Sequence, residues 1–525
     1  MKTRLKLNEL TTEQKLGMVF CARKFGTAND EDIEFTIELI KNHSLGCVQL
    51  PAHKKDVVKR VLEAADYPIL VFNDVEQGFP TSKLPPIPLM SLSACGKEEY
   101  YRAFARAVAK DAKEAGFNGT WGPVLDILKD DGPFRVYRHF SDDPEAVTRG
   151  AEIIASVYRS NRYLSTGKHY PGSDDSPYDS HMTENVADLS EEDLENFDLV
   201  PYLRLMDKGL LPCIMTRHAT YGKIDPDYPA SLSKKVINIL RRKGFDGVCF
   251  TDSLAMMGIL QRFGEENVYG MAIEAGNDII LPNYRTPTRE AFGMLLKNYR
   301  DGMISDARLD EAVRRVLAAM DFVDGEPDGK ELFTERDKEL VYDIAKDCIT
   351  AVTDDGVKAA LNDPNGDVMF VVVTENGYKI NENDAETVTE KWYYPHRIVN
   401  RIKDNFPGAA IELLPEFPDA GQNERVLFNA RNYKKVVFVT FCNTGAYLGT
   451  DGLTRRVESV INALVHSGKL ETVVHFGNPY ALKTVEHIPR KIFGYMIPDS
   501  QEYALDILAG KMEAKGKLPF SIKFN

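Results

Sequence analysis

The segment from Lys168 to His181 concentrates side chains that can transfer protons. It reads Lys-His-Tyr-Pro-Gly-Ser-Asp-Asp-Ser-Pro-Tyr-Asp-Ser-His, with two histidines and three aspartates. Asp179 and His181 are two residues apart, so in an extended segment their side chains point the same way. A carboxylate beside an imidazole favours the protonated ring and fixes its tautomer. Such a pair can give a proton near neutral pH and later take it back.

Two other interpretations of this segment are open. It could be a solvated acidic loop without chemistry, or a metal site, since His and Asp are common metal ligands. The metal site has no support from an HExxH sequence or a similar helical pair. The sequence therefore predicts neither a metal ion nor another cofactor.

Further polar side chains directly follow short apolar runs. These residues are Asp74, Asp126, Lys168, His169, Arg217, His218 and Asp252. In a barrel of parallel strands the active site forms at the carboxyl ends of the strands. We therefore expect acids, histidines and cations to converge there, and no cysteine nucleophile stands at such a position.

The elements that must position these residues are short apolar runs that alternate with amphipathic helices. The predicted strands are residues 46–50, 68–73, 117–121, 211–216, 247–251 and 278–281. Continuous apolar runs suit strands buried on both faces, as in a parallel sheet. Helices are expected at 98–115, after Asp143–Pro144, after Ser233 and at 305–320. The pattern predicts an α/β fold, an amino-terminal (β/α)8 TIM-like barrel over residues 1–322. A doubly wound sheet is the competitor, but no GxGxxG or GxxxxGK[ST] loop follows a strand.

A smaller domain is expected after this barrel. Residues 323–338 are rich in Gly, Pro and charge, which is typical of a linker. Over residues 339–525 the strand–helix pattern restarts, with strands expected at 368–373, 411–414, 436–440, 472–476 and 491–496. We interpret this part as a three-layer α/β/α sandwich.

Composition excludes several classes of protein. The chain has 525 residues, 43% hydrophobic and 27% charged, and a formal net charge of −14. An acidic surface repels phosphate backbones, so a nucleic-acid partner is not expected. No apolar run approaches the roughly 18 residues that span a bilayer. The first 15 residues do not resemble a signal peptide, so we expect a cytoplasmic protein.

The seven cysteines are scattered and form no CxxC pair. That pattern argues against a disulfide framework and against a thiolate zinc site. Cys213 and Cys249 stand in apolar runs, where we expect buried, inert thiols.

An ordered set of motifs resembles the β-N-acetylglucosaminidases of glycoside hydrolase family 3. Their signature Lys-His-Phe/Ile-Pro-Gly-His/Leu-Gly, four residues, then Asp-Ser/Thr-His, matches residues 168–172 and 179–181 at the right spacing. Further similar segments are residues 118–126, 138–144, 227–233, 244–256, 476–482 and 516–521. The resemblance covers nearly the whole chain.

The resemblance implies a retaining glycosidase. Asp252 would match the nucleophile, and His181, held by Asp179, would match the general acid and base. The other interpretation of Asp252 is a helix N-cap after the strand, a place where Asp is common.

Sugar binding would fall to Asp74, Arg138, Lys168 and His169, with His218 as a further candidate. A carboxylate accepts from two vicinal hydroxyls, while Arg and Lys donate to the remaining oxygens. For Arg138 a surface ion pair, for example with Asp142, is the alternative. For His218 and Asp126 it is a structural hydrogen bond.

Two departures from the family pattern concern substrate binding. A family arginine that helps bind substrate falls on Ser82, where the neighbouring Lys83 could replace it. In the signature loop, Ser173 and Asp174 replace a His-Gly pair. Loss of a glycine stiffens a loop that is expected to move. Both changes bear on the second unit of the substrate.

The resemblance predicts a cytoplasmic exo-acting β-N-acetylglucosaminidase, with small fragments of peptidoglycan, chitin or glycans as substrates. Three alternatives are a phosphorylase of the same architecture, a β-glucosidase of the same superfamily, and a catalytically silent sugar-binding protein. The second domain would either cover the barrel opening or mediate homodimer formation.

Overall fold

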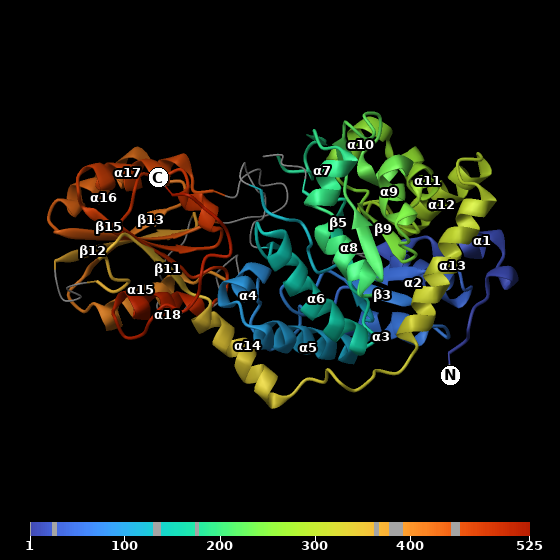
Figure 1. The fold of residues 1–525 in the computed structure, drawn as a ribbon, viewed down its shortest axis with the longest axis horizontal. Helices are drawn as coiled ribbons and strands as arrows, with labels where there is room; N and C mark the ends of the chain where they lie inside the picture. Colours follow the sequence, from blue (N-terminus) through green and yellow to red (C-terminus); the bar gives the residue numbers. More distant parts are fainter. Residues whose placement is uncertain are drawn as a thin grey trace. The chain divides into compact units, whose positions relative to one another are not determined.

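A computed structural model describes residues 2–23, 29–129, 138–173, 178–361, 367–376, 392–442 and 452–524. The chain divides into two compact units (Figure 1). The first unit contains Met1–Lys83, Tyr101–Pro133 and Asp142–Asp337. The second contains Leu84–Tyr100, Phe134–Ser141 and Lys338–Asn525. The division is not one cut in the sequence, because two short segments of the first third fold with the carboxyl-terminal part.

The first unit is built on two four-stranded parallel sheets. Their orders are β1-β2-β3-β4 and β10-β9-β7-β5. The strands are β1 (Cys21–Arg23), β2 (Cys47–Gln49), β3 (Leu70–Asn73), β4 (Gly119–Thr120), β5 (Thr166–Tyr170), β7 (Cys213–Thr216), β9 (Val248–Ser253) and β10 (Ile279–Leu281). Parallel bridges join the two sheets at both ends, between Phe20 and Ile280 and between Gly119 and Leu164. A separate parallel pair is formed by β6 (Asn185–Ala187) and β8 (Ala219–Tyr221).

Aromatic rings from both sheets meet in the core of this unit. The ring centroid of Phe72 on β3 lies 5.1 Å from that of Phe250 on β9 and 5.8 Å from that of Trp121. All three side chains are buried. Gly119 lets β4 approach this cluster, because a Cβ there would lie 2.2 Å from the Phe72 ring. The two sheets therefore face each other across a shared apolar interior.

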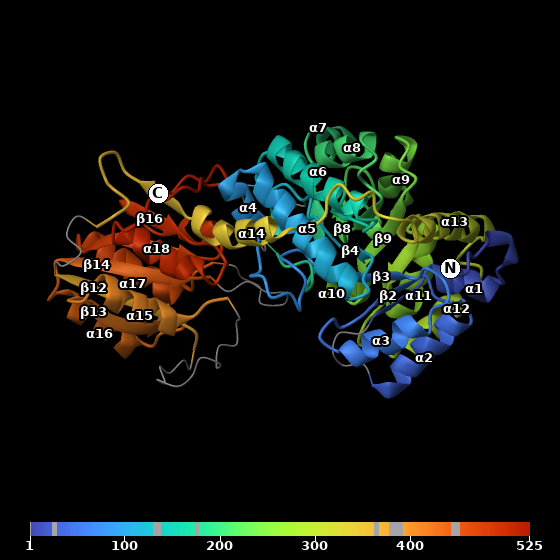
Figure 2. The same ribbon diagram turned by 90° about the horizontal axis from the view of Figure 1, so that it is seen from below.

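Helices follow most of the strands. They are α1 (Thr12–Met18), α2 (Asp30–Lys41), α3 (Lys55–Glu63), α5 (Glu98–Glu114), α6 (Pro144–Ser160), α7 (Glu191–Asn196), α8 (Val200–Asp207), α9 (Lys234–Arg242), α10 (Met257–Phe263), α11 (Glu265–Ala275), α12 (Thr288–Arg300) and α13 (Asp306–Val323), with the 3-10 turns η1 (Leu7–Glu9) and η3 (Ala230–Leu232). The caps predicted at Asp143 and Ser233 are present, since each side chain accepts a backbone N–H of the first turn. Figure 2 shows α13 beside α1, where Lys15 and Asp310 form an ion pair of 2.6 Å.

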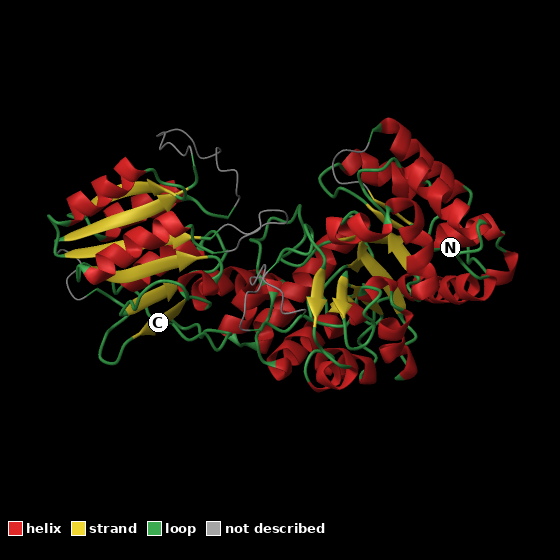
Figure 3. Ribbon diagram, turned by 90° about the horizontal axis from the view of Figure 1, so that it is seen from above, coloured by secondary structure: helices red, strands yellow, loops and turns green. Residues whose placement is uncertain are grey.

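The second unit holds a six-stranded sheet between two pairs of helices (Figures 1 and 3). The strand order is β11-β16-β15-β14-β12-β13, and β11 pairs antiparallel in an otherwise parallel sheet. The strands are β11 (Thr350–Thr353), β12 (Val368–Thr374), β13 (Ala410–Pro415), β14 (Lys435–Phe441), β15 (Leu470–Phe476) and β16 (Arg490–Phe493). Helices α16 (Ala420–Ala430) and α17 (Arg455–His466) cover one face, and α15 (Pro395–Asn405) and α18 (Ser500–Leu508) cover the other. The unit also contains α4 (Leu89–Cys95), most of α14 (Glu335–Asp347) and the turn η4 (Pro479–Leu482).

Five strands were not expected from the sequence, namely β1, β5, β6, β8 and β11. β1 is only three residues long, although the apolar run Met18–Ala22 leads into it, and β11 is four residues long and lacks a long apolar run. β5 contains Thr166, Lys168 and His169, and polar residues of this kind are typical of a loop. Lys168 and His169 were expected in a loop after the apolar run Tyr163–Leu164, but both lie on β5 itself.

The expectations for the thiols are confirmed, since Cys213 and Cys249 are buried. Burial raises the pKa of the Cys249 thiol to about 12, so it stays protonated. Within the described residues no helix has the length and hydropathy needed to cross a bilayer.

Buried His475 on β15 makes the stability of the second unit depend on pH. Its Nε2 donates to the Asn478 carbonyl at 2.9 Å, and its Nδ1 accepts from the Thr440 hydroxyl at 2.8 Å. Burial lowers the pKa of His475 to about 4, from the ordinary 6.5. Between these two pKa values the unfolded chain binds a proton at His475 that the folded chain does not bind. The free energy of unfolding therefore falls as the pH drops from 6.5 toward 4.

We predict that His475→Gln removes this dependence, because a glutamine amide does not titrate, while it still offers a donor and an acceptor at this position. Between pH 6.5 and pH 4 the wild type should lose about 3 kcal/mol more unfolding free energy than the variant. Urea unfolding at several pH values measures the difference. The control is His466→Gln on the exposed end of α17. Parallel pH curves for wild type and His475→Gln would contradict the prediction.

Candidate active site

The predicted polar residues of the first unit gather at one edge of its sheets. Asp74 directly follows β3, Lys168 and His169 lie on β5, and Asp252 lies near the end of β9. The strands run parallel, so their carboxyl ends share one edge. This edge carries the candidate site.

The carboxylate of Asp252 is the centre of the site. Its side chain is 23% exposed, and its Oδ1 accepts the Ser253 N–H at 2.6 Å. Burial raises the pKa of Asp252, but the charges of His169, His218 and His181, together with that N–H, outweigh burial and hold the pKa below its usual value. Asp252 is therefore ionised at neutral pH.

The helix-cap interpretation of Asp252 is wrong. The next helix, α10, begins at Met257, and its N-cap residue is Met256, which makes no side-chain cap. Asp252 lies four residues earlier, on β9. Its carboxylate is thus not used to terminate a helix.

His169 lies between two carboxylates. Its backbone N–H donates to Asp126 Oδ1 at 3.0 Å, and its Nδ1 lies 2.7 Å from Asp126 Oδ2. Because a carboxylate only accepts, Nδ1 carries the proton. The opposite nitrogen, Nε2, lies 3.8 Å from Asp252 Oδ2. Asp126 thus orients the imidazole that contributes most to lowering the pKa of Asp252.

Asp179 and His181 are in contact, as predicted, although not through an extended backbone. Asp179 Oδ1 accepts the His181 N–H at 2.9 Å and lies 2.7 Å from His181 Nδ1. The Asp179 carbonyl accepts the N–H groups of Met182 and Thr183, so the chain turns here. The His181 carbonyl in turn accepts the Met257 N–H at 3.0 Å. The carboxylate fixes the tautomer and the orientation of the His181 ring.

Lys168 joins two carboxylates that follow β3. Its side chain is 2% exposed, and its Nζ lies 3.0 Å from Asp74 Oδ1 and in contact with Glu76 Oε1. Asp74 is half exposed, whereas Glu76 is nearly buried. Glu76 was not among the predicted site residues. It stands two residues after Asp74, and this spacing of two acids after a strand was the available signal.

His218 has protein partners on both ring nitrogens. Nε2 donates to the Ser253 carbonyl at 3.0 Å, and Nδ1 accepts from the Ser231 hydroxyl at 2.7 Å. Burial lowers the pKa of His218, so the ring is neutral at neutral pH. These bonds leave neither nitrogen for a sugar hydroxyl. His218 instead ties the residue after Asp252 to η3.

Arg23 on β1 is a site residue that the sequence did not reveal. It is buried, and its guanidinium donates to Gln49 Oε1 at 2.9 Å and to Ser253 Oγ at 2.7 Å. Burial lowers the pKa of Arg23, while the charges of Asp74 and Asp252 oppose that shift. Its cation therefore faces both carboxylates. Arg23 directly follows the apolar run Met18–Ala22, so its position after such a run was a signal that went unused.

Arg138 belongs to the second unit and directly follows residues outside the described part of the chain. Asp174, one of the departures from the family pattern, lies outside the described residues. The other two departures have visible partners. Ser82 donates to Asp111 Oδ2 at 2.5 Å, and the Ser173 N–H donates to Asp198 Oδ1 at 3.1 Å.

Gly172 must remain a glycine for the loop to reach Asp198. Its φ is +134°, and a Cβ there would lie 2.3 Å from the Asp198 Cβ. The Gly172 carbonyl accepts from Arg217 and from the Tyr221 hydroxyl. The Pro-Gly part of the signature thus anchors the start of the loop that leads to Asp179.

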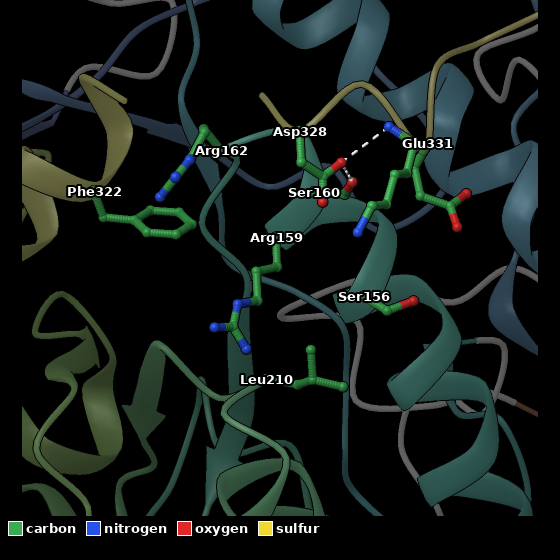
Figure 4. Close-up of a pocket in the computed structure, with 9 residues that line it drawn as sticks. Ser156, Arg159, Ser160, Arg162, Leu210, Phe322, Asp328 and Glu331 are labelled. Carbon is green, nitrogen blue, oxygen red and sulfur yellow. Dashed lines mark hydrogen bonds between the residues drawn. The ribbon is translucent and has the colours of Figure 1, made fainter. Parts of the chain in front are cut away.

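A separate hollow of about 510 Å³ lies elsewhere in the first unit (Figure 4). It is lined by Ser156, Arg159, Ser160, Arg162, Leu210, Phe322, Asp328, Lys330 and Glu331. Ser160 precedes β5, so the hollow is at the opposite end of the strands from Asp252. Arg162 donates to the Glu326 carbonyl at 3.0 Å and packs over Phe322. These contacts anchor the segment after α13.

The arrangement can perform displacement at a carbon centre. Asp252 is an ionised carboxylate, a group that can act as a nucleophile, and His181 is an oriented imidazole, a group that can give and accept a proton. Among the described residues no group of three or more His, Cys, Asp or Glu side chains could hold a metal ion. Acids and cations around Asp74 offer hydrogen bonds to several hydroxyl groups.

The chain belongs to glycoside hydrolase family 3. The model of the glycosyl hydrolase family 3 N terminal domain matches residues 5–319. A Cellulomonas fimi protein named beta-N-acetylglucosaminidase/beta-glucosidase is 28% identical over 336 residues, 60% of this chain and 58% of that protein. A beta-hexosaminidase of Tolumonas auensis is 30% identical over 235 residues, 43% of this chain and 69% of that protein. An uncharacterized secreted glycosyl hydrolase of Arthroderma benhamiae is 31% identical over 265 residues, 48% of this chain and 74% of that protein.

Solved structures share the fold over almost the whole chain. A family 3 β-N-acetylglucosaminidase from Paenibacillus sp. str. FPU-7 has a TM-score of 0.80 at 23% identity, covering 98% of this chain and 100% of that one. A beta-glucoside phosphorylase also has a TM-score of 0.80, at 21% identity, covering 98% and 95%. The likeness therefore includes both units.

We predict that Arg23→Met lowers kcat/KM for glycoside hydrolysis by about ten- to a hundredfold. The loss of hydrogen bonds from a charged donor costs about 1.5–3 kcal/mol. In this variant Ser253, next to Asp252, loses the hydrogen bond from the Arg23 guanidinium. Arg23→Lys keeps the charge but not the paired donors, so it should restore only part of the activity. Steady-state kinetics on an aryl glycoside measure both.

The matched control is Arg289→Met, which removes an exposed arginine paired with Glu38. It should leave kcat/KM unchanged. If Arg23→Met is folded and as active as this control, Arg23 does not position the residues around Asp252.

Proposed function

We propose that this chain is a retaining, exo-acting β-N-acetylglucosaminidase. Its substrates would be small oligosaccharides that end in N-acetylglucosamine, such as fragments of peptidoglycan, chitin or glycans. The observation that carries the proposal is the ionised Asp252 among three imidazoles, with His181 held by Asp179. Family membership and the names of the relatives support it.

The first chemical step forms a glycosyl ester on Asp252. A carboxylate oxygen of Asp252 attacks the anomeric carbon while the bond from that carbon to the leaving oxygen breaks. The proton on His181 moves to the leaving oxygen, so the aglycone departs as a neutral alcohol. His181 is then neutral, and the negative charge of Asp252 has been used in the ester bond.

The second step returns the enzyme to its starting state. Neutral His181 accepts a proton from water, whose oxygen attacks the anomeric carbon and displaces Asp252 as a carboxylate. Two inversions at the same carbon retain its configuration. Asp179 holds the imidazole in one tautomer through both steps, and its charge stabilises the protonated ring.

An imidazole as acid and base fits the electrostatics of the site. A second carboxylate near Asp252 would raise the pKa of one of the two, whereas an imidazole lowers the pKa of Asp252. The nucleophile therefore stays ionised while its neighbour carries the proton. His169, whose Nε2 lies 3.8 Å from Asp252 Oδ2, likewise lowers the pKa of Asp252.

Asp74, Lys168, His169 and Arg138 are proposed to bind the sugar. Asp74 is the most exposed of the first three, and its pairing with Lys168 fixes the direction of its free oxygen. Vicinal hydroxyls would donate to Asp74 and accept from Lys168. His218, the fifth predicted residue, is proposed to position Ser253, because its nitrogens are occupied.

The first unit is proposed to be a closed (β/α)8 barrel and the second a three-layer α/β/α sandwich. Bridges and backbone hydrogen bonds between the two sheets, at Val19 and Ile280 and at Leu164 and Thr120, support closure. We retain 1–322, 323–338 and 339–525 as the proposed catalytic domain, linker and second domain. A cytoplasmic location and a homodimer through the second domain stay predictions.

Phosphorolysis is the second candidate function. An imidazole, unlike a carboxylate, does not repel an incoming phosphate, and the pair of Asp179 and His181 favours this alternative over a glutamate-dependent β-glucosidase. Aryl N-acetylglucosaminide, glucoside and xyloside are assayed with and without phosphate. Free N-acetylglucosamine, formed equally fast without phosphate, is the expected product. A sugar 1-phosphate product would contradict the hydrolase.

We predict that His181→Ala slows cleavage according to the leaving group. With a poorly acidic alcohol as leaving group, kcat/KM should fall about 10²–10⁴-fold, because general acid catalysis is lost. With dinitrophenolate, which needs no proton, the loss should be far smaller. Stopped-flow and steady-state assays on an aryl series measure the slope against leaving-group pKa.

The control for this series is His43→Ala, which removes a histidine that is remote from the site and paired with Asp66. It should reproduce the wild-type slope. An equal loss on all leaving groups in His181→Ala would show that His181 is not the acid. Unchanged turnover in Asp252→Ala would mean that the activity does not come from this site.

A further inference from the structure

Exposed apolar side chains gather beside the dyad of Asp179 and His181. Within the described residues of the first unit, six large apolar side chains are exposed, and all but Leu332 lie between residues 178 and 257. The five are Tyr178, Met182, Val186, Tyr228 and Met257. Scattered exposed apolar residues need no explanation, but a group of them in one place does.

Three members flank the dyad directly, and we call Tyr178, Met182 and Met257 the dyad patch. Tyr178 precedes Asp179, and Met182 follows His181 in the sequence. Met257 is distant in sequence, but its N–H donates to the His181 carbonyl at 3.0 Å. The exposed fractions of the three are 66%, 47% and 37%.

The rest of the group continues along α10, which Figure 1 shows at the top of the first unit. Tyr228 stacks on Phe263, the last residue of α10, with ring centroids 5.9 Å apart. Arg262 on the same helix bonds to Glu184 Oε1 at 2.8 Å, which ties α10 to the segment before Val186. The segment from Tyr178 to Val186 and helix α10 therefore form one connected surface.

We propose that the dyad patch binds an apolar aglycone, an alkyl or aryl group on the glycoside that is cleaved. The proposal rests on the proposed function of His181 as acid. The acid donates its proton to the oxygen that joins sugar and aglycone, so side chains beside the acid border the aglycone. Sugar-binding groups such as Asp74 and Lys168 are polar, whereas the dyad patch is apolar on the same edge.

The chemistry of these side chains fits such a group. Methionine is unbranched and polarisable, and it adapts to ligands of irregular shape. A tyrosine ring can stack on an aryl ring or on the apolar face of a further sugar. A charged aglycone would gain nothing from these three side chains. The patch thus favours glycosides whose leaving group is at least partly hydrophobic.

The test is a series of alkyl N-acetyl-β-glucosaminides from methyl to octyl. Beyond the shortest members, chain length changes hydrophobicity but hardly the acidity of the leaving alcohol. Complete burial of a methylene corresponds to about a fourfold gain, so on this half-exposed patch kcat/KM should rise about twofold per methylene. Met182→Ser and Met257→Ser should each lower the ratio of octyl to methyl kcat/KM several-fold.

The ratio of octyl to methyl kcat/KM is taken within each variant. A loss of alkyl-group binding is thereby separated from damage to the proton donor His181, which affects both glycosides. The matched control is Phe428→Ser, which removes an exposed apolar side chain of the second unit and should leave the ratio unchanged. Turnover of the methyl glycoside tests the proposed function, and the dependence on chain length tests the patch.

Three results would overturn the proposal. One is a flat alkyl series in the wild type while the methyl glycoside is cleaved. Another is a wild-type slope in both methionine variants. The third is a dimer in sedimentation that Met182→Ser and Met257→Ser dissociate without a change in the ratio, since the patch is then an interface between two copies. If no glycoside of the series is cleaved, the proposed function fails first.

Discussion

The site depends on keeping a largely enclosed carboxylate ionised. Burial alone would raise the pKa of Asp252 and favour its neutral form, which is a poor nucleophile. Three imidazoles and one N–H reverse that effect. The three imidazoles come from different parts of the chain. His169 lies on β5, His218 follows β7, and His181 lies in the segment before β6. The fold is therefore needed to bring these groups together around Asp252, since no single segment contains them.

The strand that carries Asp252 is itself fixed by charge. Asp278, fully buried, accepts the Cys249 N–H of β9 at 2.9 Å and pairs with Arg241, Arg308 and Arg315. Removing one member of such a buried network leaves uncompensated charge and is strongly destabilising. Before Asp252 in β9, this network holds Cys249 and fixes the register of the strand. After Asp252, His218 and Arg23 bond to Ser253, so the strand is held on both sides of Asp252.

The sequence predicted those parts of the fold and the site that depend on residues close together in the chain. Apolar runs located β3, β7 and β9, and the spacing of Asp179 and His181 indicated a proton-transfer pair. It did not reveal β5, because this short strand carries polar side chains of the site and lacks the apolar pattern of a buried strand. Local signals existed for Arg23 and Glu76, namely the apolar run before Arg23 and the short spacing from Asp74. What each residue does depends on a partner far along the chain, Ser253 in one case and Lys168 in the other.

Trapping the glycosyl ester shows whether Asp252 forms a covalent bond with the sugar. The protein is treated with 5-fluoro-β-N-acetylglucosaminyl fluoride, which forms the ester but slows its hydrolysis, and is digested for mass spectrometry. We expect one added sugar on the peptide that contains Asp252, and none in Asp252→Asn. A label on another carboxylate, such as Glu76 or Asp126, or turnover without any ester, would contradict it.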